Sequence, residues 1–364
     1  MLYRSPPSTP LHILAFAETL QGGGVERALL RMAAGWLERG HRVTLVLGAC
    51  EGPLAAELPA DIELIELGSP HYPILMQLPR VVRKVDPDVV FCPGNYYTAA
   101  AAMIRLRLGR DCPPIIAKVS NALVRPEMWR MVAWGYHRWL RWHPSFLDHV
   151  VAMTPAMARE AMTEMALPAD RVSVIANPPA ERIVDAAPIA LPQGRYIVGV
   201  GRLESQKRWD RLIDALPRLS DPKIRLLLLG EGSARAPLEA QVARLGLADR
   251  VTMPGHVSDP LPALKHATVA ALTSDYEGVP GVVREALSQG TPVVATEASV
   301  AVRELIDSPV LGTVVPREDG DALAAALDHW IAPGRPRPAP RADEGDPVGD
   351  YLALFSRLAR QRIA

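Results

Sequence analysis

The stretch that decides the fold is 269-VAALTSDYEGVPGVVREALSQGTPVVAT-296. It opens with a short apolar run, Val269 to Thr273, which is typical of a buried parallel strand. A turn-forming segment with two glycines and a proline follows from Ser274 to Gly281. A helix is predicted from near Gly281 to Gly290, and a second strand from Pro292 to Ala295. The pattern therefore predicts one repeat of a parallel α/β sheet.

Two carboxylates flank the predicted loop. Glu277 lies inside it, and Glu285 lies about one turn into the helix. Open α/β sheets bind ligands at the carboxyl ends of their strands, where this loop belongs. Carboxylate oxygens suit the vicinal hydroxyls of a sugar, and free backbone N–H groups at a helix start suit a phosphate. The loop is therefore a candidate site for a phosphorylated sugar.

The sequence from Glu277 to Thr296 resembles the signature E-G-x-P-x-x-x-x-E-A-x-x-x-G-x-P-V-V-A-T of the retaining glycosyltransferases of family 4. The resemblance implies α/β architecture of the GT-B type: two facing Rossmann-like domains with a central cleft. It also implies sugar transfer from a nucleotide-sugar donor. By this resemblance Glu277 holds the donor sugar and takes part in catalysis, and Glu285 binds the ribose. The phosphate cradle would include Gly278, Val279, Pro280 and Gly281.

A second strand-and-loop stretch is 196-YIVGVGRLESQKRWD-210. Arg202 and Lys207 follow the predicted strand, and two cations there suit a pyrophosphate, because Arg binds two oxygens in a fork and Lys acts as a point charge. The family carries the same G-R-x-x-x-x-K arrangement, which implies that both residues are catalytic and neutralise the leaving diphosphate. The family also holds the nucleobase through backbone groups near the position of Val257.

Near the start of the chain, a strand from Leu11 to Ala17 leads into a loop with three glycines, Gly22, Gly23 and Gly24, and then a helix. The loop can present backbone amides to an anion. Arg27 stands where the last glycine of G-x-G-x-x-G belongs, which argues against a nicotinamide-dependent dehydrogenase. The Gly-Gly-Gly-x-Glu-Arg sequence resembles the first loop of the same family, which contacts the donor.

Further strands are predicted in the first half of the chain, with helical stretches between most of them, so this half reads as a doubly wound parallel sheet. They are Arg42–Leu47, Ile62–Glu66, Asp88–Cys92, Ile115–Val119, His149–Met153 and Val172–Ile175.

The loops after two of these strands give candidate acceptor residues, Asn95, Tyr96, Ser120 and Asn121. Many relatives have a histidine in the second of these loops. Ser120 or Asn121 could replace its hydrogen bonds but not its charge.

The predicted domains are an N-terminal Rossmann-like acceptor domain (1–183), a hinge (184–194) and a C-terminal donor domain (195–347). The last helix, 348–364, is expected to pack back on the N-terminal domain. The Pro- and Arg-rich connector 332–347 is expected to be mobile.

Residues 128–144 hold four of the seven tryptophans among several arginines. Such a helix suits an anionic lipid surface and would fit a lipid-linked acceptor. Two alternatives remain open: a core helix with a solvated basic face, and an arginine cluster for an anionic acceptor.

The composition bears on which partners the protein can bind. The 364 residues include 40 Lys plus Arg and 40 Asp plus Glu, so the chain has no net positive charge that would favour nucleic-acid binding. Cys50, Cys92 and Cys112 have no metal or redox spacing. The triplet Asp86-Pro87-Asp88 precedes a strand, at the edge away from ligands, so it is not read as a metal site. We expect no metal and no cofactor, and a cytoplasmic protein, with membrane association on the cytoplasmic face through 128–144.

The sequence thus predicts a metal-independent retaining hexosyltransferase. It would move a hexose or N-acetylhexosamine from a nucleotide-diphosphate sugar, UDP rather than GDP, to a glycan or lipid-linked saccharide in cell-envelope or exopolysaccharide biosynthesis, including lipopolysaccharide. Two alternatives remain: a sugar-nucleotide epimerase or phosphorylase on the same scaffold, and a non-catalytic nucleotide- or lipid-binding relative.

Overall fold

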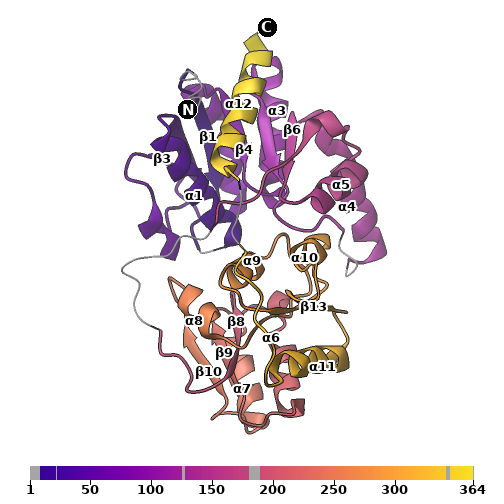
Figure 1. The fold of residues 1–364 in the computed structure, drawn as a ribbon. Coiled ribbons are helices and arrows are strands. Elements are labelled where there is room, and N and C mark those ends of the chain that lie inside the picture. Colours follow the sequence, from indigo (N-terminus) through magenta and orange to yellow (C-terminus); the bar gives the residue numbers. More distant parts are fainter. Residues whose placement is uncertain (1–8, 22, 125–127, 180–188, 342–344, 364) are drawn as a thin grey trace, which may run out of the picture. The chain divides into compact units, whose positions relative to one another are not determined.

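The computed structural model describes residues 9–21, 23–124, 128–179, 189–341 and 345–363. The chain forms two compact units, shown as ribbons in Figure 1. The first unit contains Met1–Pro178 and Gly345–Ala364, and the second contains Pro179–Glu344. Residues 184–188 of the predicted hinge lie outside the described residues.

The first unit is built on a seven-stranded sheet in the order β3-β2-β1-β4-β5-β6-β7, with every pair parallel. The strands are β1 His12–Ala17, β2 Arg42–Leu47, β3 Glu63–Glu66, β4 Val89–Cys92, β5 Ile115–Lys118, β6 His149–Ala152 and β7 Val172–Val174. The helices are α1 Gly24–Glu38, α2 Leu78–Val85, α3 Thr98–Leu108, α4 Arg130–Trp142, α5 Pro155–Met165 and α12 Pro347–Ile363.

The second unit has a six-stranded parallel sheet in the order β10-β9-β8-β11-β12-β13. Its strands are β8 Tyr196–Val200, β9 Arg225–Leu229, β10 Val251–Gly255, β11 Val269–Leu272, β12 Val293–Thr296 and β13 Gly312–Val315. Its helices are α6 Trp209–Ala215, α7 Arg235–Arg244, α8 Leu261–His266, α9 Gly281–Ser288, α10 Val300–Leu305 and α11 Gly320–Ile331.

The predicted class, two α/β domains with parallel sheets, is confirmed. In each sheet the strand order reverses beside the first strand of the unit, at β1 between β2 and β4 and at β8 between β9 and β11. The loops that follow neighbouring strands diverge at such a switch point and leave room for a ligand at the carboxyl edge. The central strands β1, β4, β11 and β12 are buried at every residue, which explains why they read as unbroken apolar runs.

The C-terminal helix α12 belongs to the first unit, where it lies beside α1 and β4 (Figure 1). Its Phe355 ring lies 5.3 Å from the Trp36 ring of α1, and its Tyr351 ring lies 5.3 Å from Phe91 of β4, measured between centroids. All four side chains are buried. Edge-to-face packing of buried aromatic rings stabilises the position of α12 beyond the area that it covers.

The Pro- and Arg-rich connector is described over 332–341 and 345–347, and residues of its first part are hydrogen-bonded to the second unit. Arg337 Nη1 donates to the carbonyl of Ala267 at 2.7 Å, and the Arg341 amide donates to the carbonyl of Leu287 at 3.0 Å. The connector passes so close to Gly290 (φ +66°) that an added Cβ would lie 2.8 Å from the carbonyl oxygen of Pro338. Arg335, Arg337 and Arg341 each donate to a backbone carbonyl.

Replacing Phe355 by Ala should lower the free energy of unfolding by about 3–5 kcal/mol, because a buried aromatic ring is lost and a cavity is left. Leu106→Ala, at a side chain that is 69% exposed in the same unit, is the control and should change it by less than about 0.5 kcal/mol. Urea unfolding followed by circular dichroism measures both. Equal effects of the two substitutions would contradict the packing of α12.

Candidate functional site

The loop after β11 buries a carboxylate. Glu277 is 9% exposed, and its Oε1 accepts hydrogen bonds from Lys207 Nζ and from Ser274 Oγ, each at 2.6 Å. Ser274 is fully buried. A buried carboxylate needs an opposite charge and hydrogen-bond donors, and this one has both.

Lys207 reaches Glu277 because the loops after β8 and β11 are tied together. Thr273 Oγ1 donates to the carbonyl of Lys207 at 2.9 Å, and the Asp275 amide donates to the carbonyl of Gln206 at 2.9 Å. Gln206 Nε2 in turn donates to the carbonyl of Tyr276 at 2.6 Å. At Gly201 (φ +154°) an added Cβ would lie 3.3 Å from Cε of Lys207, so glycine leaves the lysine stem its space.

A third loop, after β12, completes the support of Glu277. The Glu277 amide donates to the carbonyl of Ala298 at 3.0 Å, and Ser299 Oγ donates to the carbonyl of Gly278 at 2.6 Å. Three strand-following loops therefore fix one carboxylate and one ammonium at the carboxyl edge of the sheet.

A cluster of charged side chains around Asp275 also connects these loops. Asp275 accepts from Arg211 at 2.7 Å and from Arg208 at 3.4 Å, and its carbonyl accepts from Arg317 at 2.9 Å. Sequence reasoning missed this cluster and missed Ser274. The position of Ser274, three residues before Glu277 and directly after a buried strand, was the available signal.

The other predicted donor residues take different positions. Arg202 is exposed, and its carbonyl accepts from the indole of Trp209 at 3.0 Å. Glu285 is half-buried in α9. A Cβ added to Gly281, the first residue of that helix, would lie 3.7 Å from Oε1 of Glu285, so the carboxylate lies beside the first turn of α9. Val257 is half-buried and packs on the core after β10. Pro280 precedes α9, and Val279 lies in the loop before it.

In the first unit, Gly23 is the N-cap of α1 and Gly24 is its first residue, whereas Gly22 lies outside the described residues. Glu26, in the first turn, folds back over Gly23, where an added Cβ would lie 2.1 Å from its Oε2. A side chain at Gly23 would require the Glu26 carboxylate to move. Tyr97 Oη, which follows β4, donates to Glu26 Oε1 at 3.2 Å.

The predicted acceptor residues come together at the same edge. Asn95 Oδ1 accepts from Ser120 Oγ at 3.0 Å, and Asn95 Nδ2 donates to the carbonyl of Asn121 at 3.5 Å. Tyr96 is 63% exposed, and its hydroxyl donates to Glu18 Oε2 at 3.3 Å. These residues follow β1, β4 and β5, which are neighbours in the sheet.

A buried lysine stands beside this group, and sequence reasoning gave it no role. Lys118, the last residue of β5, is 1% exposed, and Nζ donates to Asn177 Oδ1 at 3.1 Å. Burial lowers the pKa of Lys118 to about 8, against the opposing attraction of Glu26.

The triplet before β4 has structural contacts. Asp88 Oδ2 accepts the amide of His12 at 2.7 Å, and Asp86 ends α2 in the left-handed conformation at φ 48°. Among the residues that the structure describes, no group of three or more His, Cys, Asp or Glu side chains is arranged to hold a metal ion.

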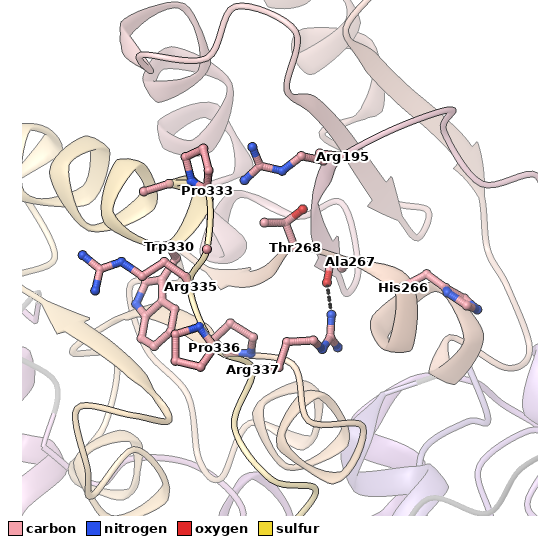
Figure 2. A pocket seen from close by; sticks show the side chains of 12 residues that line it. Arg195, His266, Ala267, Thr268, Trp330, Pro333, Arg335, Pro336 and Arg337 are labelled. Carbon is pink, nitrogen blue, oxygen red and sulfur yellow. Dashed lines mark hydrogen bonds between the residues drawn. The ribbon is translucent and has the colours of Figure 1, made fainter.

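A cavity of about 350 Å³ in the second unit lies at the opposite edge of the sheet (Figure 2). Arg195, Thr268 and Pro292 in its lining directly precede β8, β11 and β12. Arg337, also in the lining, is engaged with the connector contacts described above. The cavity is therefore separate from the loops that hold Lys207 and Glu277.

Helix α4 is exposed along most of its length. Leu140 is its buried residue, and Trp129, Met131 and Trp134 are 85%, 87% and 66% exposed. Of the alternative interpretation, a core helix with a solvated basic face, the solvated basic face is present, because Arg130, Arg138 and Arg141 are exposed. In the described part of the chain, no helix combines the length and the apolar character that crossing a membrane requires.

Two α/β units, each built on one parallel sheet, are the fold of the GT-B class. The chain belongs to the glycosyltransferases: residues 22–178 match the model described as Glycosyltransferase Family 4, and residues 194–332 match Glycosyl transferases group 1.

The relatives agree with this family. The chain is 30% identical over 353 residues to the alpha-D-kanosaminyltransferase of Streptomyces kanamyceticus, covering 88% of this chain and 90% of that protein. It is 32% identical over 179 residues to the lipopolysaccharide core biosynthesis glycosyltransferase LpsE of Rhizobium meliloti, covering 48% of this chain and about half, 50%, of that protein. The solved structure of HepE from Anabaena in complex with UDP-glucose superposes with a TM-score of 0.71 at 20% identity, covering 97% of this chain and 98% of that one.

Removing one member of the Lys207–Glu277 pair should destabilise the protein, because it leaves the other charge buried without its partner. Lys207→Met and Glu277→Gln should each cost about 3 kcal/mol, and the double variant less than their sum. The matched control is the exposed pair Arg303–Glu297, whose side chains are 61% and 46% exposed and whose coupling should stay below about 1 kcal/mol. Urea unfolding of both double-mutant cycles measures the coupling. Similar couplings would contradict a special role for the buried pair.

Proposed function

We propose that this protein is a retaining glycosyltransferase that uses a UDP-sugar donor. It moves a hexose or N-acetylhexosamine to a glycan or lipid-linked saccharide acceptor in cell-envelope or exopolysaccharide biosynthesis. The observation that carries the proposal is the Glu277–Lys207 pair, fixed at 2.6 Å by three loops at the carboxyl edge of the second sheet. A relative named for lipopolysaccharide core biosynthesis and a structural neighbour solved in complex with UDP-glucose support it.

In the proposed reaction the donor lies on the second unit. The carboxylate of Glu285 binds the ribose hydroxyls, Glu277 binds hydroxyls of the donor sugar, and backbone groups near Val257 take the base. Arg202 and Lys207 stabilise the charge that develops on the leaving diphosphate, which is electrostatic catalysis by preorganised cations. The first turn of α9 and the glycine loop of the first unit supply further donors to the phosphates.

The bond changes balance without a metal or a covalent enzyme intermediate. The bond between the anomeric carbon and the diphosphate oxygen breaks as the acceptor oxygen bonds to the same carbon on the same face. The acceptor's proton passes to the departing diphosphate, and the nucleoside diphosphate leaves. The enzyme's part is to position both substrates and to stabilise the leaving group.

The acceptor would bind on the first unit, at the group formed by Asn95, Ser120 and Asn121 with Tyr96 beside it. The amide and hydroxyl groups match sugar hydroxyls, and the exposed Tyr96 ring offers an apolar face to a sugar ring.

Thermal unfolding with equal concentrations of UDP, GDP, ADP and NAD tests the donor site. UDP at about 100 times its dissociation constant should stabilise the protein by ~2.7 kcal/mol and raise the midpoint by several degrees.

In a transfer assay with UDP-sugars, Lys207→Ala should reduce turnover by about 10- to 100-fold, and Lys223→Ala, at an exposed lysine of the same unit, should not.

The outcomes separate the rival functions. Sugar-phosphate or an epimerised nucleotide sugar released without acceptor would favour a phosphorylase or an epimerase. Folded protein that binds no nucleoside diphosphate would favour a non-catalytic binding module and overturn the proposal.

We further propose that α4 docks on an anionic lipid surface, where a lipid-linked acceptor would be presented. Arg130, Arg138 and Arg141 are exposed on the same helix as the exposed tryptophans, and the Arg138 guanidinium lies 5.2 Å from the centre of the Trp134 ring. Tryptophan and arginine together suit the headgroup region of a bilayer, where apolar rings insert and cations meet lipid phosphates.

Vesicle sedimentation tests this docking. The protein should bind vesicles of phosphatidylcholine with phosphatidylglycerol, and more weakly vesicles of phosphatidylcholine alone. The double substitution Trp129→Ser/Trp134→Ser should weaken binding on the order of tenfold, since two interfacial rings are lost. Leu106→Ser, at a 69% exposed side chain on α3, is the control. Equal binding by both variants would contradict docking through α4.

A further inference from the structure

The cavity at the amino edge of the second sheet has a basic lining. It measures about 350 Å³, and Arg195, Arg335, Arg337 and His266 are among its lining residues. Among the residues that the structure describes, the lining contains no aspartate and no glutamate. The three arginines are exposed, so a molecule in solution can reach their guanidinium groups. A volume of this size is in the range of small-molecule sites.

Arg337 is fixed at this cavity by neutral acceptors. Its Nη1 donates to the carbonyl of Ala267 at 2.7 Å, and its Nη2 donates to the carbonyl of Lys265 at 2.9 Å and to Thr291 Oγ1. A guanidinium group has five N–H donors, so these three bonds leave others for a ligand. The bonds hold the side chain in place without neutralising its charge by a carboxylate.

The other two arginines add to an excess of positive charge. Arg335 contacts His329, whose carbonyl accepts from Nε at 3.1 Å and whose Nδ1 lies 3.0 Å from Nη2. Arg195 Nη1 lies 3.5 Å from Asp221 Oδ2. Within the described part of the chain this is the carboxylate contact of the group, so three guanidinium groups and one carboxylate leave a net charge of +2.

An apolar wall stands beside these cations. Trp330 is 5% exposed, and its indole N–H donates to Thr313 Oγ1 at 3.0 Å, so the ring has a fixed position. Pro333 and Pro336 line the same cavity. Figure 2 shows the Trp330 ring next to Pro336, with Arg195 above and Arg337 below Thr268 in this view. A ligand with a cyclic organic part therefore finds rigid apolar groups next to the charged ones.

We propose that this cavity binds a phosphate monoester whose organic part contains a ring. A phosphate monoester carries a charge of about −1.5 to −2 at pH 7, which matches the net charge of the arginine group better than the single charge of a carboxylate. Its oxygens accept pairs of N–H bonds from planar guanidinium groups. The cavity is separate from the loops that hold Lys207 and Glu277, so this ligand is additional to the nucleotide sugar and the inference does not depend on the proposed function.

Isothermal titration calorimetry of the whole protein in phosphate-free buffer tests the ligand class with three probes. Phenyl phosphate should bind at least about tenfold more tightly than inorganic phosphate, which lacks the ring, and than benzoate, which lacks the second charge. Equal affinity for benzoate and phenyl phosphate would overturn the assignment to phosphate monoesters.

Substitutions of the arginines test the location. Arg337→Gln and Arg335→Gln should each weaken phenyl phosphate binding by about 10- to 100-fold, since a charged hydrogen-bond donor to the anion is lost. The matched control is Arg341→Gln, because Arg341 lies in the same connector outside the lining and pairs with Asp307 at 3.1 Å. This control should change the affinity less than about twofold.

A substitution at Thr268 keeps the test valid if an arginine variant fails to fold. Thr268 is half-buried in the lining, and Thr268→Asp would place a carboxylate among the arginines, whereas Thr268→Asn adds no charge. Thr268→Asp should abolish phenyl phosphate binding without lowering the unfolding temperature of the ligand-free protein, because its charge opposes that of the arginines. Thr268→Asn should still bind.

Folded, unaltered protein that binds no phenyl phosphate would overturn the inference. So would unchanged binding in Arg337→Gln and in Thr268→Asp, or binding that Lys207→Ala abolishes and Arg337→Gln retains, since the anion would then lie on the loops of Lys207 and Glu277. Failure of the proposed function has a different result, because it is measured by the absence of UDP binding and of sugar transfer.

Discussion

Parallel pairing of the strands is the constraint on which the rest of the structure depends. Neighbouring parallel strands cannot be joined by a tight turn, so each strand returns through a helix, and every strand ends at the same edge of its sheet. Residues far apart in sequence therefore meet there: Lys207 and Glu277 are separated by 70 positions, and Lys118 and Asn177 by 59. Both units use this edge for their buried charged groups.

The two units satisfy a buried lysine in different ways. In the second unit Lys207 contacts a carboxylate directly, and that carboxylate has Ser274 as a second donor. In the first unit Lys118 donates to the amide oxygen of Asn177, and burial lowers the pKa of the lysine to about 8. A direct ion pair satisfies both charges at once, whereas a hydrogen bond to a neutral amide leaves part of the burial cost in place. Such a residue is stable only in a fold with stability to spare, which is common where a protein binds a ligand.

The sequence predicted the sheets well, because buried parallel strands are mostly apolar: Arg42–Leu47 has the predicted bounds, and β4, β5 and β6 end within one residue of them. The loop containing Glu277 was predicted equally well, because its turn residues and the start of the helix after it are recognised from neighbouring residues in the sequence. Long-range contacts were not predictable. A lysine at a strand end normally reaches solvent, and the buried Lys118 donates to Asn177, 59 positions later, which no local pattern places beside it. The contacts of the connector were not predictable for the same reason, because the carbonyls that accept from Arg337 lie about 70 residues earlier.

The Lys207–Glu277 pair is compatible with diphosphate binding for a geometric reason. The ammonium of Lys207 has three donors, and the pair uses one of them. A phosphate oxygen can take another without breaking the contact to Glu277, because Gly201 has no side chain beside Nζ of the lysine. In the proposed reaction Arg202, which is exposed, would bind the same phosphate in its planar fork. The carboxylate would hold the ammonium at a fixed point while the charge on the leaving group grows, because a preorganised cation lowers a barrier without reorganising at the moment of reaction.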